Sequence, residues 1–428
     1  MLLCASLATG LHGSAVPSHV SARTGGVRLT ASPSPYDDGL FAVAPMMDYT
    51  DRFLRYLLRR LSVRQTLYTE MVTANTIVHC GESELPRFLE HDGDREQPVV
   101  LQLGGADPEM LRKASSIAIP WGYTALNLNV GCPSDRVAGS GCFGAALMRE
   151  PALVADCCAA MSEGAGGDVP ITVKCRIGLT DDKEKAATAD DEADYAALTD
   201  FVETVSTRGG VKHFTVHARN AVLGGLSPAQ NRQIPPLRYH LVTRLAQDFP
   251  ELRFSLNGGI ETIEDAKSAL WPSLDERSPL SGVMVGRAVV ARPWDFATLD
   301  TDLYGEDSNP ATSRRQVLDE FCTFAAEYEA EVPQRIRRLL LAPALNLFAG
   351  EPHGKSFRRE IDTMAQADRH ANRQRPAAEM LLTAANKVLL DETLDAPPGW
   401  RWDHYKRCYL PPEEAAAERK EKAKVVGA

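Results

Sequence analysis

The chain has 428 residues, of which 44% are hydrophobic and 24% charged, and its formal net charge is −10. This length suffices for one large domain and a smaller one, with the composition of an ordinary globular protein. The acidic balance argues against a protein that coats nucleic acid indiscriminately, but it permits a local basic surface. No apolar run is long enough to span a bilayer, so we expect no membrane association. The nine cysteines form no CxxC pair, which argues against a zinc site or a disulfide framework, and no metal is expected.

The first 37 residues differ from the rest of the chain. Up to Tyr36 they contain no Asp or Glu, they carry Arg23 and Arg28, and they are rich in Ser, Ala, Thr and Gly. This composition is typical of an organellar transit peptide, and a disordered extension is the alternative. We therefore expect a chloroplast or mitochondrial location if residues 1–37 are a transit peptide, and a cytoplasmic location otherwise.

From residue 38 to 308, short β-rich runs alternate with longer segments that have room for helices. The predicted strands are residues 41–47, 66–71, 98–105, 125–131, 171–178, 213–219, 253–259 and 282–288. This rhythm predicts an α/β fold, a (β/α)₈ TIM barrel. An open doubly wound sheet is the alternative, but that fold usually has a glycine-rich turn after its first strand. Here the first strand ends in Ala44-Pro45-Met46-Met47-Asp48, without a glycine cluster, which favours the barrel.

After Asn309-Pro310 the hydrophobic period changes to that of helices. Residues 314–331, 333–348 and 377–390 read as helices, which predicts a smaller all-helical C-terminal domain over residues 309–395. Residues 396–428 are rich in Pro and then in Glu, Lys and Ala. We interpret them as a peripheral tail that ends in a short exposed helix.

Cys132 stands where a predicted strand breaks into a turn. The alternating run Ala125 to Val130 is followed by Gly131-Cys132-Pro133, which cannot continue a central strand. In a barrel of parallel strands, reacting groups are placed at this end. The simpler interpretation is a small buried hydrophobe. The neighbouring Asn127 and Asn129 favour a reactive site instead.

Other polar residues stand at the ends of the predicted strands. Lys174 and His217 end the fifth and sixth strands, and glycines follow the seventh and eighth, where barrels usually bind phosphate. Arg287 can add a charged contact to such a phosphate. A lysine, a histidine, the amide of Gln102 and a glycine-lined phosphate site would suit flavin mononucleotide (FMN). The residues alone leave open a non-redox barrel that binds a sugar phosphate.

Taken together, these blocks resemble the tRNA-dihydrouridine synthases, and most closely the branch that acts on positions 20 and 20a of the D-loop. The resemblance is dense over residues 41–303 and thinner to residue 387. It is carried, in the family's order, by residues 44–51, 68–71, 102–105, 127–134, 174–178, 217–220, 225–228, 231–237, 257–259 and 286–287. One departure is Ala342-Pro343, where bacterial members of this branch tend to have an Arg-His pair.

The resemblance implies an FMN-containing barrel that reduces the C5–C6 double bond of uridine, with NADPH as the reductant. Cys132 would donate the proton to C5, and Asn129 would face the uracil or the adjoining tRNA. FMN would be bound by Pro45, Met46, Met47, Gln102, Lys174, His217, Asn257, Gly258, Gly259, Gly286 and Arg287.

The same resemblance implies that the helical domain grips tRNA. The expected tRNA contacts are Arg219, Arg232, Arg337 and Arg358, with Arg335, Arg338, Lys355 and Arg359 as further basic residues. We expect a monomer. Two alternatives are an FMN-dependent barrel oxidoreductase that acts on a small molecule, and a non-catalytic RNA-binding relative. The basic helical domain argues against the first, and the presence of Cys132, Lys174 and His217 argues against the second.

Overall fold

The structure is a computed structural model that describes residues 39–133, 143–167, 169–182, 190–223, 226–273, 277–331 and 336–415. The predicted transit peptide lies outside the described residues, and so does Arg335. Among the described residues, the structure contains no helix that is both long enough and apolar enough to cross a membrane.

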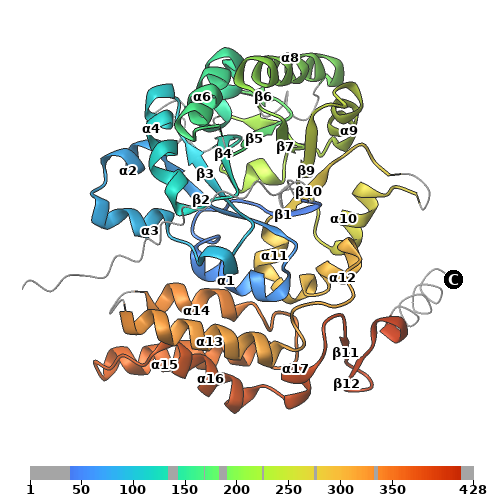
Figure 1. Ribbon diagram of the computed structural model, residues 1–428. Coiled ribbons are helices and arrows are strands. Elements are labelled where there is room, and N and C mark those ends of the chain that lie inside the picture. Colours follow the sequence, from blue (N-terminus) through green and yellow to red (C-terminus); the bar gives the residue numbers. More distant parts are fainter. Residues whose placement is uncertain are drawn as a thin grey trace, which may run out of the picture. The chain divides into compact units, whose positions relative to one another are not determined.

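Eight parallel strands close into a barrel in the order β1-β10-β9-β7-β5-β4-β3-β2 (Figure 1), which confirms the predicted fold class. The barrel strands are β1 (Phe41–Val43), β2 (Thr66–Thr73), β3 (Val99–Gly104), β4 (Ala125–Val130), β5 (Ile171–Arg176), β7 (His213–His217), β9 (Arg253–Asn257) and β10 (Gly282–Val285). The surrounding helices are α1 (Arg52–Leu61), α2 (Ala74–His79), α3 (Leu85–Leu89), α4 (Pro108–Ala118), α6 (Pro151–Gly164), α8 (Asp191–Gly209), α9 (Tyr239–Asp248), α10 (Ile263–Leu270), α11 (Arg287–Ala291) and α12 (Leu299–Tyr304). A small parallel pair, β6 (Leu179–Thr180) and β8 (Ala221–Val222), extends two of the loops after barrel strands.

Alternate residues of each strand face opposite sides of the barrel wall, as the period of a β-strand requires. The outward positions are apolar and join the core beneath the helices, as Leu126, Leu128 and Val130 of β4 do. Inside the barrel, near the amino ends of the strands, a separate cluster contains Ala42, Ala44, Tyr68, Val100, Ala125 and Met284. Toward the carboxyl ends the inward residues become polar. We call the carboxyl ends of the strands, with their polar inward residues, the mouth.

The acidic run near residue 190 has a structural role at the start of α8. Asp190 caps the helix by accepting hydrogen bonds from the backbone N–H groups of Glu192 and Ala193. Asp191 and Asp194 both form ion pairs with Arg238, which precedes α9. These contacts tie α8 to the neighbouring βα loop.

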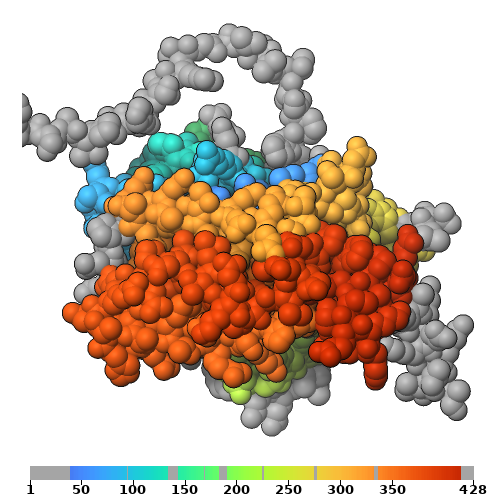
Figure 2. Space-filling view, turned by 90° about the horizontal axis from the view of Figure 1, so that it is seen from below, coloured from blue at the N-terminus to red at the C-terminus, as the bar shows by residue number. Residues whose placement is uncertain are grey.

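The C-terminal helices pack against α1 of the barrel. They are α13 (Arg314–Glu331), α14 (Arg337–Leu345), α15 (Gly354–His370), α16 (Ala377–Val388) and α17 (Asp391–Asp395). At the junction, the rings of Tyr56 and Phe324 stack with centroids 3.9 Å apart, and Phe53 meets Tyr328 edge to face. These aromatic contacts fix the helical domain on the barrel. Figure 2 shows these helices and the segment that follows them, orange to red, covering one face of the molecule.

Two parts of the C-terminal region differ from the sequence prediction. Helix α15 was not predicted, because its buried apolar stripe is only Phe357, Ile361 and Met364 in an otherwise polar stretch. The expected tail contains an antiparallel hairpin, β11 (Arg401–Asp403) and β12 (Cys408–Leu410). The hydroxyl of Tyr409 donates to Glu351, and Arg401 pairs with Asp295. Residues 401–410 are therefore tied to both the helical domain and the barrel.

Candidate active site at the barrel mouth

The turn that carries Cys132 is held by side chains from two neighbouring strands. The side-chain oxygen of Asn129 accepts hydrogen bonds from the backbone N–H groups of Gly131 and Cys132, both at 3.1 Å. Arg176 donates from Nε to the carbonyl of Gly131 at 3.1 Å. The N–H of Ala145 donates to the carbonyl of Cys132 at 2.9 Å. The thiol of Cys132 is thus presented, half-buried, on a fixed turn at the mouth.

Beneath this turn, a hydrogen-bonded chain of amide side chains links the adjacent strands β3, β4 and β5. Asn129 donates to Oε1 of Gln102 at 3.1 Å, and Gln102 donates to Asn127 at 2.8 Å. Asn127 in turn donates to the hydroxyl of Thr172 at 2.8 Å. Gln102 is fully buried, so its first role is within this network. The side-chain oxygen of Asn129 likewise accepts the two hydrogen bonds of the turn, so Asn129 is a residue that positions Cys132.

Cationic side chains and a histidine lie on β5 and β7, next to the strand that leads to Cys132. Burial, with the nearby Arg176, lowers the pKa of Lys174 to about 8. Burial lowers the pKa of His217 well below its usual value, and the charges of Arg176 and Lys174 lower it further. The imidazole is therefore neutral at pH 7. Its Nδ1 is buried and has no hydrogen-bond partner among the residues that the structure describes.

Arg176 is the site residue whose part sequence reasoning did not specify. It is buried, and besides the Gly131 carbonyl it donates to the carbonyls of Asn220 and Asn231. One guanidinium thus joins the loops that follow β4 and β7. Burial lowers the pKa of Arg176 to about 10, so it stays charged at pH 7. Its place two residues after Lys174, on the same face of β5, is the signal that could have identified it.

The glycines after β9 and β10 form the remaining wall of the mouth. Gly258 and Gly259 have φ values of 109° and 74°, which side-chain-bearing residues rarely adopt. A Cβ on Gly258 would lie 3.1 Å from the His217 ring, and one on Gly259 would lie 2.7 Å from the Tyr239 hydroxyl. Gly286 directly precedes α11, which begins with the exposed Arg287. Asn257 is occupied differently, because its amide donates to the Met284 carbonyl at 2.7 Å.

The loop after β1 lies at the same end of the barrel. Pro45 and Met46 are half-buried, while the side chain of Met47 is 54% exposed. The backbone N–H of Met46 donates to the hydroxyl of Thr50 at 2.9 Å, and the N–H of Thr50 returns to the Met46 carbonyl at 3.0 Å. This tight turn fixes the residues that the sequence assigned to the first wall of a flavin site.

The predicted tRNA contacts fall into two groups. Arg219 and Arg232 are half-buried near the mouth, and burial lowers the pKa of both, with a smaller contribution from the charge of Arg287. Arg219 donates to the carbonyl of Pro235, so it braces its own loop. Arg337 and Arg358 lie in the helical domain. The first pairs with the buried Asp368 at 2.9 Å, and the second donates to the Leu345 carbonyl at 3.0 Å. Both therefore have structural partners, although Arg358 is exposed, as are Arg338, Lys355 and Arg359.

Residues 137–148, after Cys132, are rich in glycine, and their composition suggests either a mobile cover over the base or a passive βα loop. Residues 134–142 lie outside the described residues. Of the remainder, Gly144–Arg149 form a 3₁₀ helix in which Ala145 and Leu147 are buried.

Comparison with known proteins places this arrangement in a family. The sequence pattern described as Dihydrouridine synthase (Dus) matches residues 42–386. Three similar proteins each bear the description tRNA-dihydrouridine(20/20a) synthase. The protein from Vibrio parahaemolyticus is 43% identical over 329 residues, covering 76% of this chain and 91% of its own length. That from Synechocystis sp. is 44% identical, covering 75% and 87%, and that from Salmonella typhimurium is 42% identical, covering 76% and 90%.

Proposed function

Since the chain belongs to the dihydrouridine synthase family, we propose that it reduces uridines at positions 20 and 20a of tRNA. Family membership implies a flavin, which we assign as FMN, with NADPH as the reductant. The observation that carries this proposal is the placement of the Cys132 thiol on a braced turn at the same barrel end as Lys174 and His217.

The residues at the mouth fit a flavin with a phosphate. The buried Nδ1 of His217, which has no hydrogen-bond partner among the described residues, offers a polar contact to such a ligand. Lys174 and Arg176 supply positive charge where reduced flavin would carry negative charge. At Gly258 a Cβ would contact the His217 ring, and at Gly259 it would contact the Tyr239 hydroxyl. Glycine at both positions therefore leaves this space free of side chains. Gly286 and Arg287, at the start of α11, would hold the phosphate.

When bound, reduced flavin supplies the hydride that C6 of the uracil accepts. Cys132 holds the proton that C5 requires, and Asn129 and Arg176 keep its turn in place. A positioned general acid of this kind neutralises the charge that builds toward C5 and O4. The target uridine must leave its stack to reach the mouth. Arg232, half-buried near Cys132 and Arg287, is placed to meet the RNA backbone beside that base.

The net charge of −10 means that tRNA must be held by a local basic surface. Because Arg337 and Arg358 already have protein partners, the exposed Arg338, Lys355 and Arg359 are the stronger candidates for phosphate contacts in the helical domain. Arg338 lies on α14, which packs against α1 of the barrel, whereas Lys355 and Arg359 lie on α15.

The proposal is tested by the absorption spectrum of the purified protein and by its action on tRNA that lacks dihydrouridine. We expect a flavin spectrum that NADPH bleaches, and dihydrouridine at positions 20 and 20a after incubation. A flavin spectrum without any modified uridine would favour a barrel oxidoreductase with a small-molecule substrate. A colourless protein that added FMN does not restore would overturn the proposal.

A further inference from the structure

Two loops at the mouth expose large apolar side chains. Among the described residues, the exposed large hydrophobic side chains are Met47, Tyr49, Val63, Ile234, Leu339 and Tyr405. Three of them lie in the loops after β1 and β7, at the barrel end that presents Cys132. Met47 belongs to the wall assigned to the flavin, whereas Tyr49, 55% exposed, and Ile234, 50% exposed, are not used by the site described above. Single exposed apolar side chains are ordinary, but a group of them at one opening marks a contact surface.

Tyr49 stands on a turn whose backbone is fixed. The N–H of Tyr49 donates to the Met46 carbonyl at 3.2 Å, and the fully buried Thr50 closes the same turn. Asp48 has a φ of 66°, which residues with a side chain rarely adopt, and its N–H donates to the carboxylate of Glu70 on β2. Surrounding contacts are what hold such a conformation in place. The exposed ring of Tyr49 is therefore a constant feature of this loop.

Ile234 is exposed on a loop that is anchored from beneath. Asn231 is fully buried, and its side chain hydrogen-bonds the backbone of β8 at 2.7 and 3.0 Å. Arg176, which also donates to the carbonyl of Gly131, donates to the carbonyl of Asn231 at 3.2 Å. One guanidinium therefore joins the loop that carries Ile234 to the turn that carries Cys132.

The charged groups beside these two loops differ. Next to Tyr49 are the carboxylates of Asp48 and Glu70, which would repel an RNA phosphate but not the uncharged face of a base. In the β7 loop, Arg232 lies near Tyr49 and Arg287, and its buried Nε has no hydrogen-bond partner among the described residues. Aromatic faces beside cations are the usual means by which proteins hold unstacked nucleotides. The occupant that fits both loops is a single strand of RNA.

We propose that Tyr49 stacks on a base that flanks the extruded uridine, and that Ile234 packs against the base on the other side. Extrusion leaves the two neighbouring base faces without a stacking partner. The strand order places β1 and β7 on opposite sides of β4, which leads to Cys132, so each loop can meet one of these faces. The proposal rests on the proposed function, and it adds the residues that receive the strand around the target.

Steady-state reduction of tRNA by the FMN-saturated protein tests these contacts. The ratio kcat/KM for tRNA should fall by roughly 5–150-fold in Tyr49→Ala, the usual effect of removing a stacked aromatic ring. Tyr49→Phe keeps the aromatic face and should react normally. Ile234→Ser should lower kcat/KM by about fivefold or more, because it removes apolar surface that the RNA covers. The affinity for FMN should not change in any of these variants.

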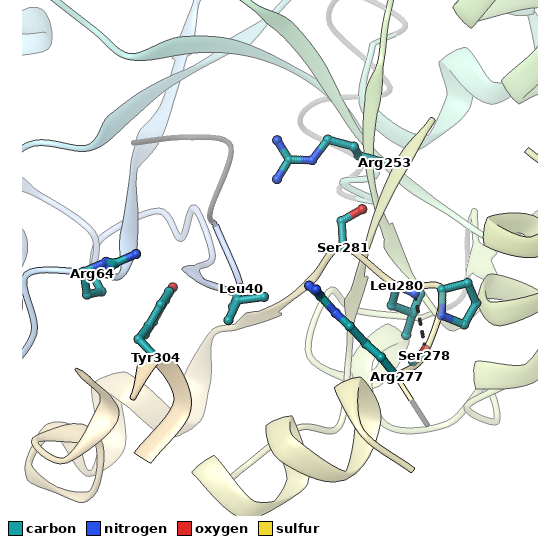
Figure 3. Close-up of a pocket in the computed structure, with 9 residues that line it drawn as sticks. Leu40, Arg64, Arg253, Arg277, Ser278, Leu280, Ser281 and Tyr304 are labelled. Atoms are coloured by element: carbon teal, nitrogen blue, oxygen red, sulfur yellow. Dashed lines mark hydrogen bonds between the residues drawn. The ribbon is translucent and has the colours of Figure 1, made fainter. Parts of the chain in front are cut away.

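Val63→Ala is the matched control, since Val63 is also exposed and lies at the opposite end of the barrel. Figure 3 shows the neighbouring Arg64 beside a cavity at the amino ends of the strands, where Arg253 begins β9 and Ser281 precedes β10. This variant should reduce tRNA at the normal rate.

A second measurement detects stacking directly and needs no turnover. A fluorescent adenine analogue placed beside the target uridine is quenched when it stacks on an aromatic ring. The unmodified protein and Tyr49→Phe should quench it on binding, and Tyr49→Ala should not.

Equal kcat/KM in Tyr49→Ala and Val63→Ala would overturn the proposal, as would equal quenching by Tyr49→Ala and the unmodified protein. Weaker FMN binding by Tyr49→Ala would overturn it too, because the ring would then belong to the flavin site. These results leave the proposed function intact. If the unmodified protein forms no dihydrouridine, the proposed function fails, and this proposal fails with it.

Discussion

Replacing Cys132 with Ala should prevent proton transfer without changing the structure of the site. The contacts that hold the turn use the backbone of Gly131 and Cys132, the carboxamide of Asn129 and the guanidinium of Arg176. None of them involves the sulfur atom. Because the thiol is only half-buried, the free energy of unfolding should change by less than about 1 kcal/mol. Flavin content should also be unchanged.

The rate of dihydrouridine formation should fall by roughly two to four orders of magnitude, the usual contribution of a general acid. This loss corresponds to about 2.7–5.4 kcal/mol of transition-state stabilisation. The assay is a single turnover of the pre-reduced protein with excess tRNA, followed by quantification of dihydrouridine. Cys408→Ala, an exposed cysteine on the hairpin, is the matched control and should react normally. A near-normal rate in Cys132→Ala would refute the assignment of the proton donor.

Three further predictions follow from the contacts at the mouth and in the helical domain. Asn129→Ala removes the acceptor of two backbone hydrogen bonds, each of which contributes about 0.5–1.5 kcal/mol. Single-turnover reduction of tRNA uridine should therefore slow by roughly 5–150-fold, with flavin still bound. An unchanged rate would show that the turn keeps its structure without Asn129. Lys174 is charged below its pKa of about 8 and neutral above it, so the affinity of the apoprotein for FMN, measured by fluorescence, should weaken between pH 7 and 9. In Lys174→Met the affinity should not depend on pH over this range. The same pH dependence in Lys174→Met would assign it to another group. Arg337→Ala removes one partner of the buried Asp368 and should lower the melting temperature. Arg338→Gln should leave the melting temperature unchanged and make the slope of log affinity for tRNA against log salt concentration shallower by about one unit. A normal melting temperature for Arg337→Ala would contradict a structural role.

The barrel could be predicted because short runs of apolar, strand-forming residues, each ended by turn residues, recur along the sequence. In residues 125–130, Leu126, Leu128 and Val130 enter the core under the helices, while Asn127 and Asn129 face inward. Apart from β2, which ends two residues after its predicted end, the predicted strands extend beyond the observed ones by one to four residues at their carboxyl ends. Those extra residues are the loops of the mouth, where the backbone leaves the ladder to present side chains.

Partners inside the site could not be read from the sequence. The pattern placed Gln102 and Asn129 at the mouth, but the network that joins them to Asn127 and Thr172 depends on the register between three strands. The partners of Arg337 and Arg358 were not evident either, since Asp368 and the Leu345 carbonyl lie far from them in the chain or on another helix. The sequence shows which polar side chains are present at a site, but their tertiary partners decide which of them remain available to bind a ligand.

The hairpin shows the same limit at the C-terminus. Residues 401–410 lack a long alternating run, and they are held by single contacts with distant residues, Tyr409 with Glu351 and Arg401 with Asp295. Glu351 also pairs with the buried Arg314 at the start of α13. Such long-range polar contacts leave no periodic signal, so composition suggested a tail.

The central claim is that this protein reduces uridine in the D-loop of tRNA. The most direct measurement is nucleotide-resolved mass spectrometry of unmodified tRNA after incubation with the purified protein, FMN and NADPH. The account predicts that uridines at positions 20 and 20a each gain two hydrogen atoms, and that Cys132→Ala leaves them unchanged over the same time. Oxidation of NADPH without any gain of hydrogen in the tRNA, or a gain that Cys132→Ala matches, would contradict it.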